Sequence, residues 1–266
     1  MTNAALLATT NYFGLVEPSN NYELNIDPKI SDADRGWIEK TLSYANGSFS
    51  SLPRERVKIF LGTSHAWSLN TLKSLNIWIG DPNSPFPCSQ GINDAYCAEK
   101  NLILLIYSDI YSANSSFRWD IGRRSTPAHE LFHTVQFSLL GTNKNLHVPR
   151  WLMEGSANFF GYFVAEKLGF GTYQEGRDQQ VTRNPAYSLV IPLEKYDDFE
   201  SDPYGIGQAA SEYLIASVGF EKFLNIWRFT NTEGSFSAGF EKATGISLEA
   251  FYLKFESARG SMRIGS

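Results

Sequence analysis

The sequence predicts an α+β fold, with a twisted, mostly antiparallel sheet and its helices in residues 1–125 and a mainly helical part in residues 126–266. Two observations support this division. Residues 57–62 (VKIFLG) and 102–107 (LILLIY) are rich in the branched and aromatic side chains typical of strands. From residue 126 onward, apolar residues recur three or four positions apart, which is the spacing of an α-helix with one buried face.

The first part is expected to alternate short strands with helices. Strands are predicted at residues 12–16, 22–26, 57–62, 76–79 and 102–107. Helices are predicted at about 31–50 and at 64–73. Residues 81–87 (DPNSPFP) are rich in Pro and Asn and predict a loop. Strands and helices in this order favour a sheet with helices on one face.

The second part is expected to consist of helices that end at glycines. The first has Thr126 as its cap, Pro127 in its first position and Gly141 at its end. A second begins after Pro149 and ends near Gly169. Further helical patterns run over residues 204–219, 220–234, 235–244 and 247–258.

Composition excludes several classes of protein. The 266 residues are 42% hydrophobic, and a chain of this length can bury roughly three quarters of its unfolded surface, so we expect one compact domain. The net charge is −5 and the charges are scattered, which argues against a nucleic-acid partner. The longest aliphatic run, residues 102–106, is too short to span a membrane. The sequence gives no indication of oligomeric state.

The two cysteines bear on the cellular compartment. Cys88 and Cys97 bracket a turn-forming segment, so we expect a short disulfide loop, worth about 2–3 kcal/mol in the chain-entropy model. Two free thiols are the alternative. A disulfide would indicate a secreted or extracytoplasmic protein, and free thiols a cytoplasmic one. The N-terminal sequence has no basic region before its short apolar run, which is not typical of a signal peptide.

The segment HELFH at residues 129–133 carries the strongest chemical signal. His129 and His133 are four residues apart, so a helix places both imidazoles on one face, where they can bind one ion. Glu130 is too close in sequence to the first ligand to bind the same ion easily, but it can reach a water on the metal. H-E-x-x-H on a helix is therefore a metalloprotease pattern, with two ligands and a general base.

Catalytic zinc usually has three protein ligands, so a third is expected. Glu154 is the candidate, because it lies on the next predicted helix, beyond a polar loop. Two antiparallel helices joined by that loop could bring Glu154 to His129 and His133. We therefore predict one Zn²⁺ ion bound by these three side chains.

The sequence HELFH, followed by seventeen residues and then WLMEG, so that twenty residues separate His133 from Glu154, resembles the gluzincin zinc peptidases, a group that includes thermolysin-like enzymes and aminopeptidases. The resemblance is sharp over residues 126–161 and weaker to about residue 255. It implies a zincin-like fold, His129, His133 and Glu154 as zinc ligands, and Glu130 as the catalytic base. It also implies that Tyr204, in a Y-x-x-G context, donates a hydrogen bond to the developing oxyanion.

Asn158 is the predicted second partner of a metal-bound histidine. It follows Glu154 by one helical turn, and thermolysin-like enzymes have Asp at that spacing. A metal-bound histidine usually donates its other N–H to such an acceptor. His147 lies in the loop and is expected to be structural or exposed.

The resemblance also implies where a peptide or protein substrate would bind. In these peptidases substrate pairs with the edge strand nearest the metal helix, which predicts backbone contacts from Leu102, Ile103, Leu104 and Leu105. A buried central strand is the equally favoured alternative. The aminopeptidases carry a G-x-M-E-N stretch here, and this chain has none, which favours an endopeptidase.

Two further alternatives remain open at this stage. An aminopeptidase or a narrow-substrate zinc hydrolase would use the same metal. A binding protein with a structural or vestigial zinc site would also contain these residues, since H-E-x-x-H occurs by chance and paired histidines can be ordinary core residues.

Overall fold

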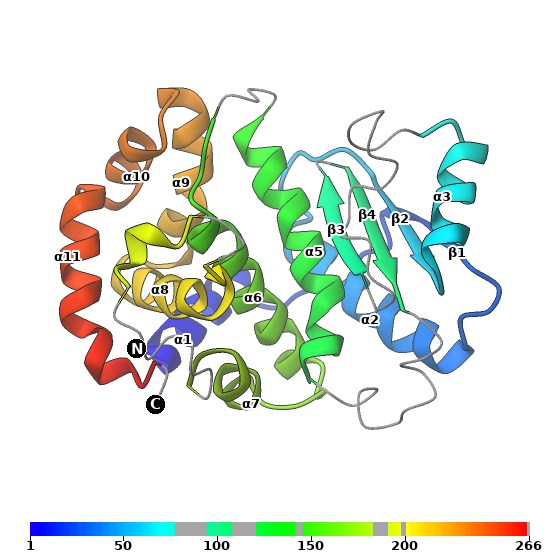
Figure 1. The fold of residues 1–266 in the computed structure, drawn as a ribbon, viewed down its shortest axis with the longest axis horizontal. Helices are drawn as coiled ribbons and strands as arrows, with labels where there is room; N and C mark the ends of the chain where they lie inside the picture. The colour runs from blue at the N-terminus through cyan, green and yellow to red at the C-terminus, as the bar shows by residue number, and fades with distance from the viewer. Residues whose placement is uncertain are drawn as a thin grey trace.

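The computed structural model describes residues 1–77, 95–99, 101–107, 121–141, 146–182, 191–197 and 201–264. A sheet with its helices lies on one side and a group of helices on the other, with helix α5 between them (Figure 1). Mixed α and β structure with a predominance of helix confirms the coarse fold class. Among the described residues, no helix combines the length and the apolar character needed to cross a membrane.

The described elements are strands, helices and short turns. The strands are β1 (Tyr22–Ile26), β2 (Val57–Gly62), β3 (Ala95–Glu99) and β4 (Leu102–Ile106). The helices of the sheet region are α2 (Asp32–Ser48), α3 (His65–Ser74) and α5 (Ile121–Leu140). The other helices are α1 (Thr2–Phe13), α6 (Arg150–Lys167), α7 (Tyr173–Arg177), α8 (Pro203–Val218), α9 (Phe220–Glu233), α10 (Phe236–Thr244) and α11 (Leu248–Arg259). Short π and 3-10 turns occupy Asp178–Thr182, Leu193–Lys195 and Gly260–Met262.

The described strands form a sheet in the order β1-β2-β4-β3. β1 pairs parallel with β2, and β2 pairs parallel with β4, whereas β3 pairs antiparallel with β4. The prediction of a mostly antiparallel sheet is therefore wrong. The reason is the connection: α2 returns the chain from the end of β1 to the start of β2, and a crossover through a helix makes the two strands parallel.

Alternate residues of the central strands enter two separate cores. Ile59, Leu61, Ile103 and Leu105 join the large core on the side of α2 and α5. Phe60, Leu102, Leu104 and Ile106 pack with α3 on the opposite face. Helices therefore cover both faces of the sheet, which explains why β2 and β4 are apolar at almost every position.

β4 is an interior strand. Its backbone is paired with β2 on one side, as Leu104 with Phe60, and with β3 on the other, as Leu104 with Cys97. The prediction that Leu102, Ile103, Leu104 and Leu105 form a substrate-binding edge is wrong, because their backbone hydrogen-bonding groups are used within the sheet. The central-strand alternative is correct. Among the described strands the outer position beside α5 belongs to β3 (Figure 1).

Two other local predictions differ from the structure. Residues 12–16 were expected in a strand, but helix α1 includes Tyr12 and ends at Gly14, whose φ is 58°. The Ala- and Leu-rich run before it favours a helix. Asn76 begins no strand: its φ is 53°, and the Ile77 N–H bonds to the Leu72 carbonyl, so the chain turns here. Residues 78 and 79 of that predicted strand lie outside the described residues.

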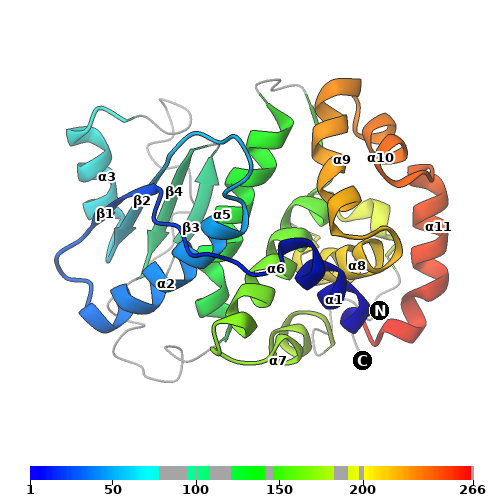
Figure 2. The same ribbon diagram turned by 180° about the vertical axis from the view of Figure 1, so that it is seen from behind.

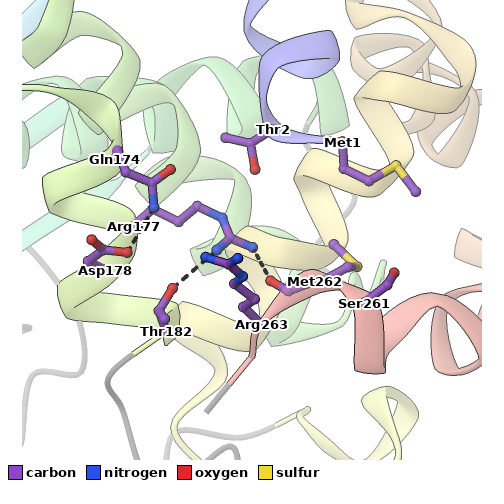
Figure 3. Close-up of a pocket in the computed structure, with 9 residues that line it drawn as sticks. All are labelled: Met1, Thr2, Gln174, Arg177, Asp178, Thr182, Ser261, Met262 and Arg263. Atoms are coloured by element: carbon purple, nitrogen blue, oxygen red, sulfur yellow. Dashed lines mark hydrogen bonds between the residues drawn. The ribbon is translucent and has the colours of Figure 1, made fainter. Parts of the chain in front are cut away.

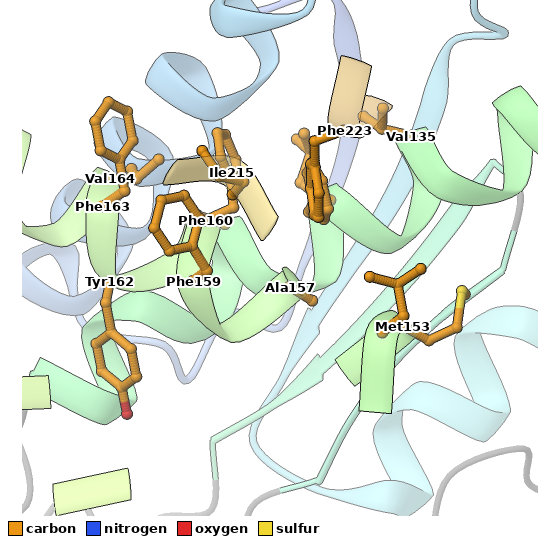
Figure 4. Close-up of a cluster of buried hydrophobic side chains, with 14 of the residues drawn as sticks. Val135, Met153, Ala157, Phe159, Phe160, Tyr162, Phe163, Val164, Ile215 and Phe223 are labelled. Carbon is orange, nitrogen blue, oxygen red and sulfur yellow. The ribbon is translucent and has the colours of Figure 1, made fainter. Parts of the chain in front are cut away.

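The N-terminal helix lies with the C-terminal helices. α1 packs beside α8 in both views (Figures 1 and 2), and the Thr2 hydroxyl donates to Glu212 on α8 at 2.8 Å. The first residues therefore belong with the helical part and not with the sheet, which differs from the division expected at residue 125. The centre of this part is a set of aromatic and aliphatic side chains from α5, α6, α8 and α9 (Figure 4).

A buried polar network joins α1, α7 and α8. The Arg177 Nε donates to both carboxylate oxygens of Glu212, at 3.1 and 2.9 Å, and the Tyr173 hydroxyl donates to Glu212 at 2.8 Å. A cavity of about 360 Å³ lies beside Arg177, lined also by Gln174, Thr182 and Arg263 (Figure 3). None of the residues that line this cavity belongs to the HELFH segment, and Glu154 is not among them.

Candidate metal centre

Helix α5 carries His129, Glu130 and His133. The described helix already includes Ile121, so Thr126 and Pro127 lie inside it. The sequence had predicted Thr126 and Pro127 at its start, and that prediction is wrong. The Thr126 hydroxyl donates to the Gly122 carbonyl at 3.1 Å, an interaction available to Thr within a helix. The predicted end is confirmed, because Gly141 has a φ of 74° and its N–H bonds to the Phe137 carbonyl.

Helix α6 carries Glu154 and begins after Pro149, as predicted. It packs directly on α5, and Gly161 makes the close approach possible. A Cβ at Gly161 would lie 2.9 Å from the Ser125 carbonyl oxygen and 3.4 Å from the His129 Cβ. Because Gly161 has no side chain, the two helices come near enough for a carboxylate on one to reach imidazoles on the other.

His129, His133 and Glu154 converge on one point. The two Nε2 atoms are 3.0 Å apart, and the Glu154 Oε2 lies 3.4 Å from His129 Nε2 and 3.3 Å from His133 Nε2. Ligand atoms about 2.0–2.1 Å from a tetrahedral ion are separated by about 3.3 Å. The three predicted ligands therefore have the spacing of three corners of a zinc-sized tetrahedron, and this buried group could hold a metal ion.

The other ring nitrogens show which tautomer each histidine adopts. His129 Nδ1 lies 2.9 Å from Asn158 Oδ1, and His133 Nδ1 lies 2.7 Å from Gln136 Oε1. An amide oxygen only accepts, so each Nδ1 carries the proton and donates it. Each neutral ring then directs the lone pair of Nε2 toward the Glu154 carboxylate. Three electron-rich atoms face one another, and a cation is needed to hold them together.

The pKa values of the cluster also indicate that a positive charge is stabilised there. The pKa of His133 is raised to about 9, because burial opposes the charged ring but the negative charges of Glu154 and Glu130 outweigh it. Burial likewise opposes ionisation of Glu154, yet the two histidines hold the pKa of its carboxyl well below the usual range. A proton on His133 can therefore supply the cation, and so can a metal ion.

Glu130 lies beside the three ligands without joining them. Its Oε1 is 4.0 Å from His129 Nε2, and its Oε2 is buried with no hydrogen-bond partner among the described residues. Burial raises the pKa of Glu130, and the neighbouring imidazoles only partly offset this. A buried carboxylate oxygen without a partner is suited to accept a proton from a water or substrate placed at the site.

Tyr204 lies in the first turn of α8, next to the cluster. Its ring stacks on the His129 ring, with centroids 6.3 Å apart and planes inclined by 30°. Burial and the negative charges of Glu154 and Glu130 raise the pKa of Tyr204 well above its usual value. The phenol therefore keeps its proton and can donate it in a hydrogen bond.

Two glycines bring Tyr204 to this position. A Cβ on Gly155, the residue after Glu154, would clash with the Gly207 backbone, and a Cβ on Gly207 would clash with the Trp151 carbonyl. Helices α6 and α8 thus cross with their backbones in contact. Because Tyr204 lies one turn before Gly207, this crossing places it beside Glu154.

Two residues of the site were not predicted from sequence. Gln136 follows His133 by three residues, and Arg150 precedes Glu154 by four, with its Nη1 3.8 Å from Glu154 Oε1. Both spacings place a side chain on the ligand face of its own helix, which is the signal that could have found them. His147 is exposed and pairs with Asp197 at 2.8 Å, away from the ligands, as expected.

The cysteine prediction falls outside what the structure describes. Cys88 lies beyond the described residues, and Cys97 is placed in β3 only by its backbone. The disulfide remains a prediction.

Comparisons of the chain with protein-family models and with curated proteins, and of the fold with solved structures, gave no match.

Proposed function

We propose that the protein is a zinc-dependent peptidase in which His129, His133 and Glu154 bind the metal. The observation that carries this proposal is the convergence of two Nε2 lone pairs and one carboxylate oxygen at 3.0–3.4 Å. Two imidazoles and one carboxylate form a donor set typical of catalytic zinc, which leaves a fourth position for water or substrate. The similarity of HELFH and WLMEG to gluzincins supports the same conclusion.

The chain's own residues supply the acid–base chemistry. When bound, zinc would supply a Lewis acid that lowers the pKa of a water and polarises a carbonyl. Glu130, with its unpaired buried oxygen and raised pKa, accepts the proton of the attacking water and returns it to the leaving amine. The protonated Tyr204 phenol donates to the oxygen of the carbonyl as negative charge develops there.

The strand available to an extended peptide is β3. Of the two outer strands of the described sheet, β1 and β3, it is the one that lies next to α5 (Figure 1). A peptide paired with its outer backbone groups would be held without regard to side chains, which favours endopeptidase activity on unfolded protein. Aminopeptidase activity and hydrolysis of a narrow substrate are rival uses of the same metal.

The test uses an unfolded protein substrate such as reduced, carboxymethylated lactalbumin. We expect the zinc-loaded protein to cleave it, a chelator to stop cleavage, and Glu130→Gln to lower kcat by about 10²–10⁴-fold while zinc remains bound in a 1:1 ratio. Full activity in Glu130→Gln would refute its role as the base. Blocked and free-amine peptides would distinguish endopeptidase from aminopeptidase activity.

A structural zinc site is the second candidate. It is favoured by the low exposure of the three ligands, which is 9%, 7% and 6% for His129, His133 and Glu154. A closed fourth position would exclude exchangeable ligands. Binding of hydroxamate or azide to the cobalt-substituted protein, seen as a change in its visible spectrum, would rule this candidate out.

A further inference from the structure

Gln136 connects the two helices that carry the ligands. It is fully buried, and its Oε1 lies 2.7 Å from His133 Nδ1 on its own helix. Its Nε2 donates to the Met153 carbonyl at 2.9 Å and to the Ser156 hydroxyl at 2.8 Å, both on α6. Met153 directly precedes Glu154, so the contact lies at the backbone that presents the third ligand.

These contacts fix the orientation of the amide. The Met153 carbonyl only accepts, so the amide nitrogen must face α6 and the amide oxygen must face His133. Ser156 agrees, because its hydroxyl donates to the Leu152 carbonyl at 2.5 Å and leaves a lone pair for Gln136. The Met153 carbonyl thus orients the Gln136 amide, and the amide oxygen in turn determines that the proton of His133 lies on Nδ1.

The partner of the other histidine is held less firmly. Asn158 accepts from His129 Nδ1 at 2.9 Å, but its Nδ2 is buried without a hydrogen-bond partner among the described residues. No described residue bonds to the amide nitrogen of Asn158 and fixes its orientation. The two histidines therefore differ in how strongly the protein determines their geometry.

We propose that Gln136 is the main positioning residue of the metal centre. It holds the proton of His133 on Nδ1 and ties α6, which carries Glu154, to α5. The inference rests on the proposed metal site, and it assigns to Gln136 a larger share of the metal affinity than to Asn158. A buried acceptor behind a metal-bound histidine is generally worth about 10–100-fold in affinity.

The test measures zinc affinity by competition with a chromophoric chelator, together with the visible spectrum of the cobalt-substituted protein. Gln136→Met has a similar volume and no hydrogen bonds, and we expect it to weaken zinc binding by about 10–100-fold and to alter the cobalt spectrum. Gln136→Glu keeps the acceptor for His133 but loses the donor to the Met153 carbonyl, so we expect it to bind zinc more weakly than the wild type but at least about threefold more tightly than Gln136→Met. Asn158→Leu is the matched control and should lose less than Gln136→Met.

Unchanged affinity and spectrum in Gln136→Met would overturn the inference, and so would a folded Gln136→Glu variant that binds as weakly as Gln136→Met. Long-range ¹H–¹⁵N spectra of the zinc-loaded wild type provide a test that needs no variant. They should show His133 protonated at Nδ1 and metal-bound at Nε2, and the reverse assignment would contradict the proposal. If the wild type bound no zinc at all, the proposed function itself would fail.

Discussion

Glu212 and Glu154 are buried carboxylates with different kinds of partner. Glu212 on α8 faces Arg177, whose Nε lies 2.9 and 3.1 Å from its two oxygens, and receives further hydrogen bonds from Tyr173 and Thr2. Glu154 on α6 faces the Nε2 atoms of His129 and His133 at 3.4 and 3.3 Å. Glu212 therefore meets a permanent cation at hydrogen-bond distance. Glu154 meets, at its Oε2, two rings that are neutral unless one of them gains a proton, and its Oε1 lies 3.8 Å from Arg150 Nη1.

Glu212 belongs to a structural network, and Glu154 belongs to a candidate metal site. A guanidinium is always charged, so the Glu212 network is complete within the chain. When the two imidazoles are neutral, with their protons on Nδ1, they offer Glu154 only lone pairs. The second cluster is therefore open to a cation from outside, and this difference can be tested by disturbing each cluster in turn.

The largest expected effect is on metal binding. Glu154→Ala and His133→Ala each remove one of three ligands, and we expect either variant to lose 1:1 zinc binding at micromolar concentrations. Glu212→Gln should bind zinc as the wild type does. Metal content after gel filtration, measured by atomic emission, checks this, and zinc retained in both ligand variants would mean that the ion lies elsewhere.

Disrupting the Arg177–Glu212 network should instead lower the stability of the fold. Arg177→Met leaves Glu212 buried without its cation, which is expected to cost about 3–5 kcal/mol in the free energy of unfolding. Urea denaturation with zinc present measures it. Arg35→Met, which removes an exposed pair with Glu39, is the control and should change stability by less than about 1 kcal/mol. Equal effects of the two substitutions would mean that the buried Arg177–Glu212 pair stabilises the fold no more than an exposed pair does.

Zinc itself should stabilise the protein through the Glu154 cluster alone. At a free concentration a thousand times Kd, a ligand of the folded state adds about 4 kcal/mol to the free energy of unfolding. We expect Tm to rise with zinc and to fall on chelation, in the wild type and in Arg177→Met alike. No rise should occur in His133→Ala.

Tyr204→Phe tests whether the cluster around Glu154 is catalytic as well as metal-binding. Removing one hydroxyl that donates to a developing negative charge is expected to lower kcat by about 10²-fold, with little change in KM. Zinc affinity and Tm should remain close to those of the wild type. A change confined to KM would instead place Tyr204 in substrate binding.

The smallest expected effect is a pH dependence of the metal-free protein. The pKa of His133 is raised to about 9 in the folded state, against 6.5 when unperturbed, so folding is favoured by binding a proton. The resulting stability is complete below about pH 6.5 and is lost as the pH rises toward 9. In the presence of a chelator we expect Tm to fall by a few °C across this range, and His133→Ala to lack that fall.

The ligand positions could be predicted from sequence because they depend on local geometry. The spacing of His129 and His133 fixes their side chains on one face of a helix whatever surrounds it. The glycine at 141 and the proline at 149 likewise act within a few residues. The same local logic failed for Thr126 and Pro127, since a good start signal does not prevent a helix from beginning earlier when packing favours it.

The sequence by itself determined which side chains could meet an ion, because a helical turn is set by the backbone of a few consecutive residues. Only the tertiary structure decided that β1, β2 and β4 run parallel, that β4 is interior, that α1 lies among the C-terminal helices, and that Gln136 reaches across to Met153. These features join residues far apart in the chain, and local periodicity carries no information on which distant partner a buried face or an amide group will find.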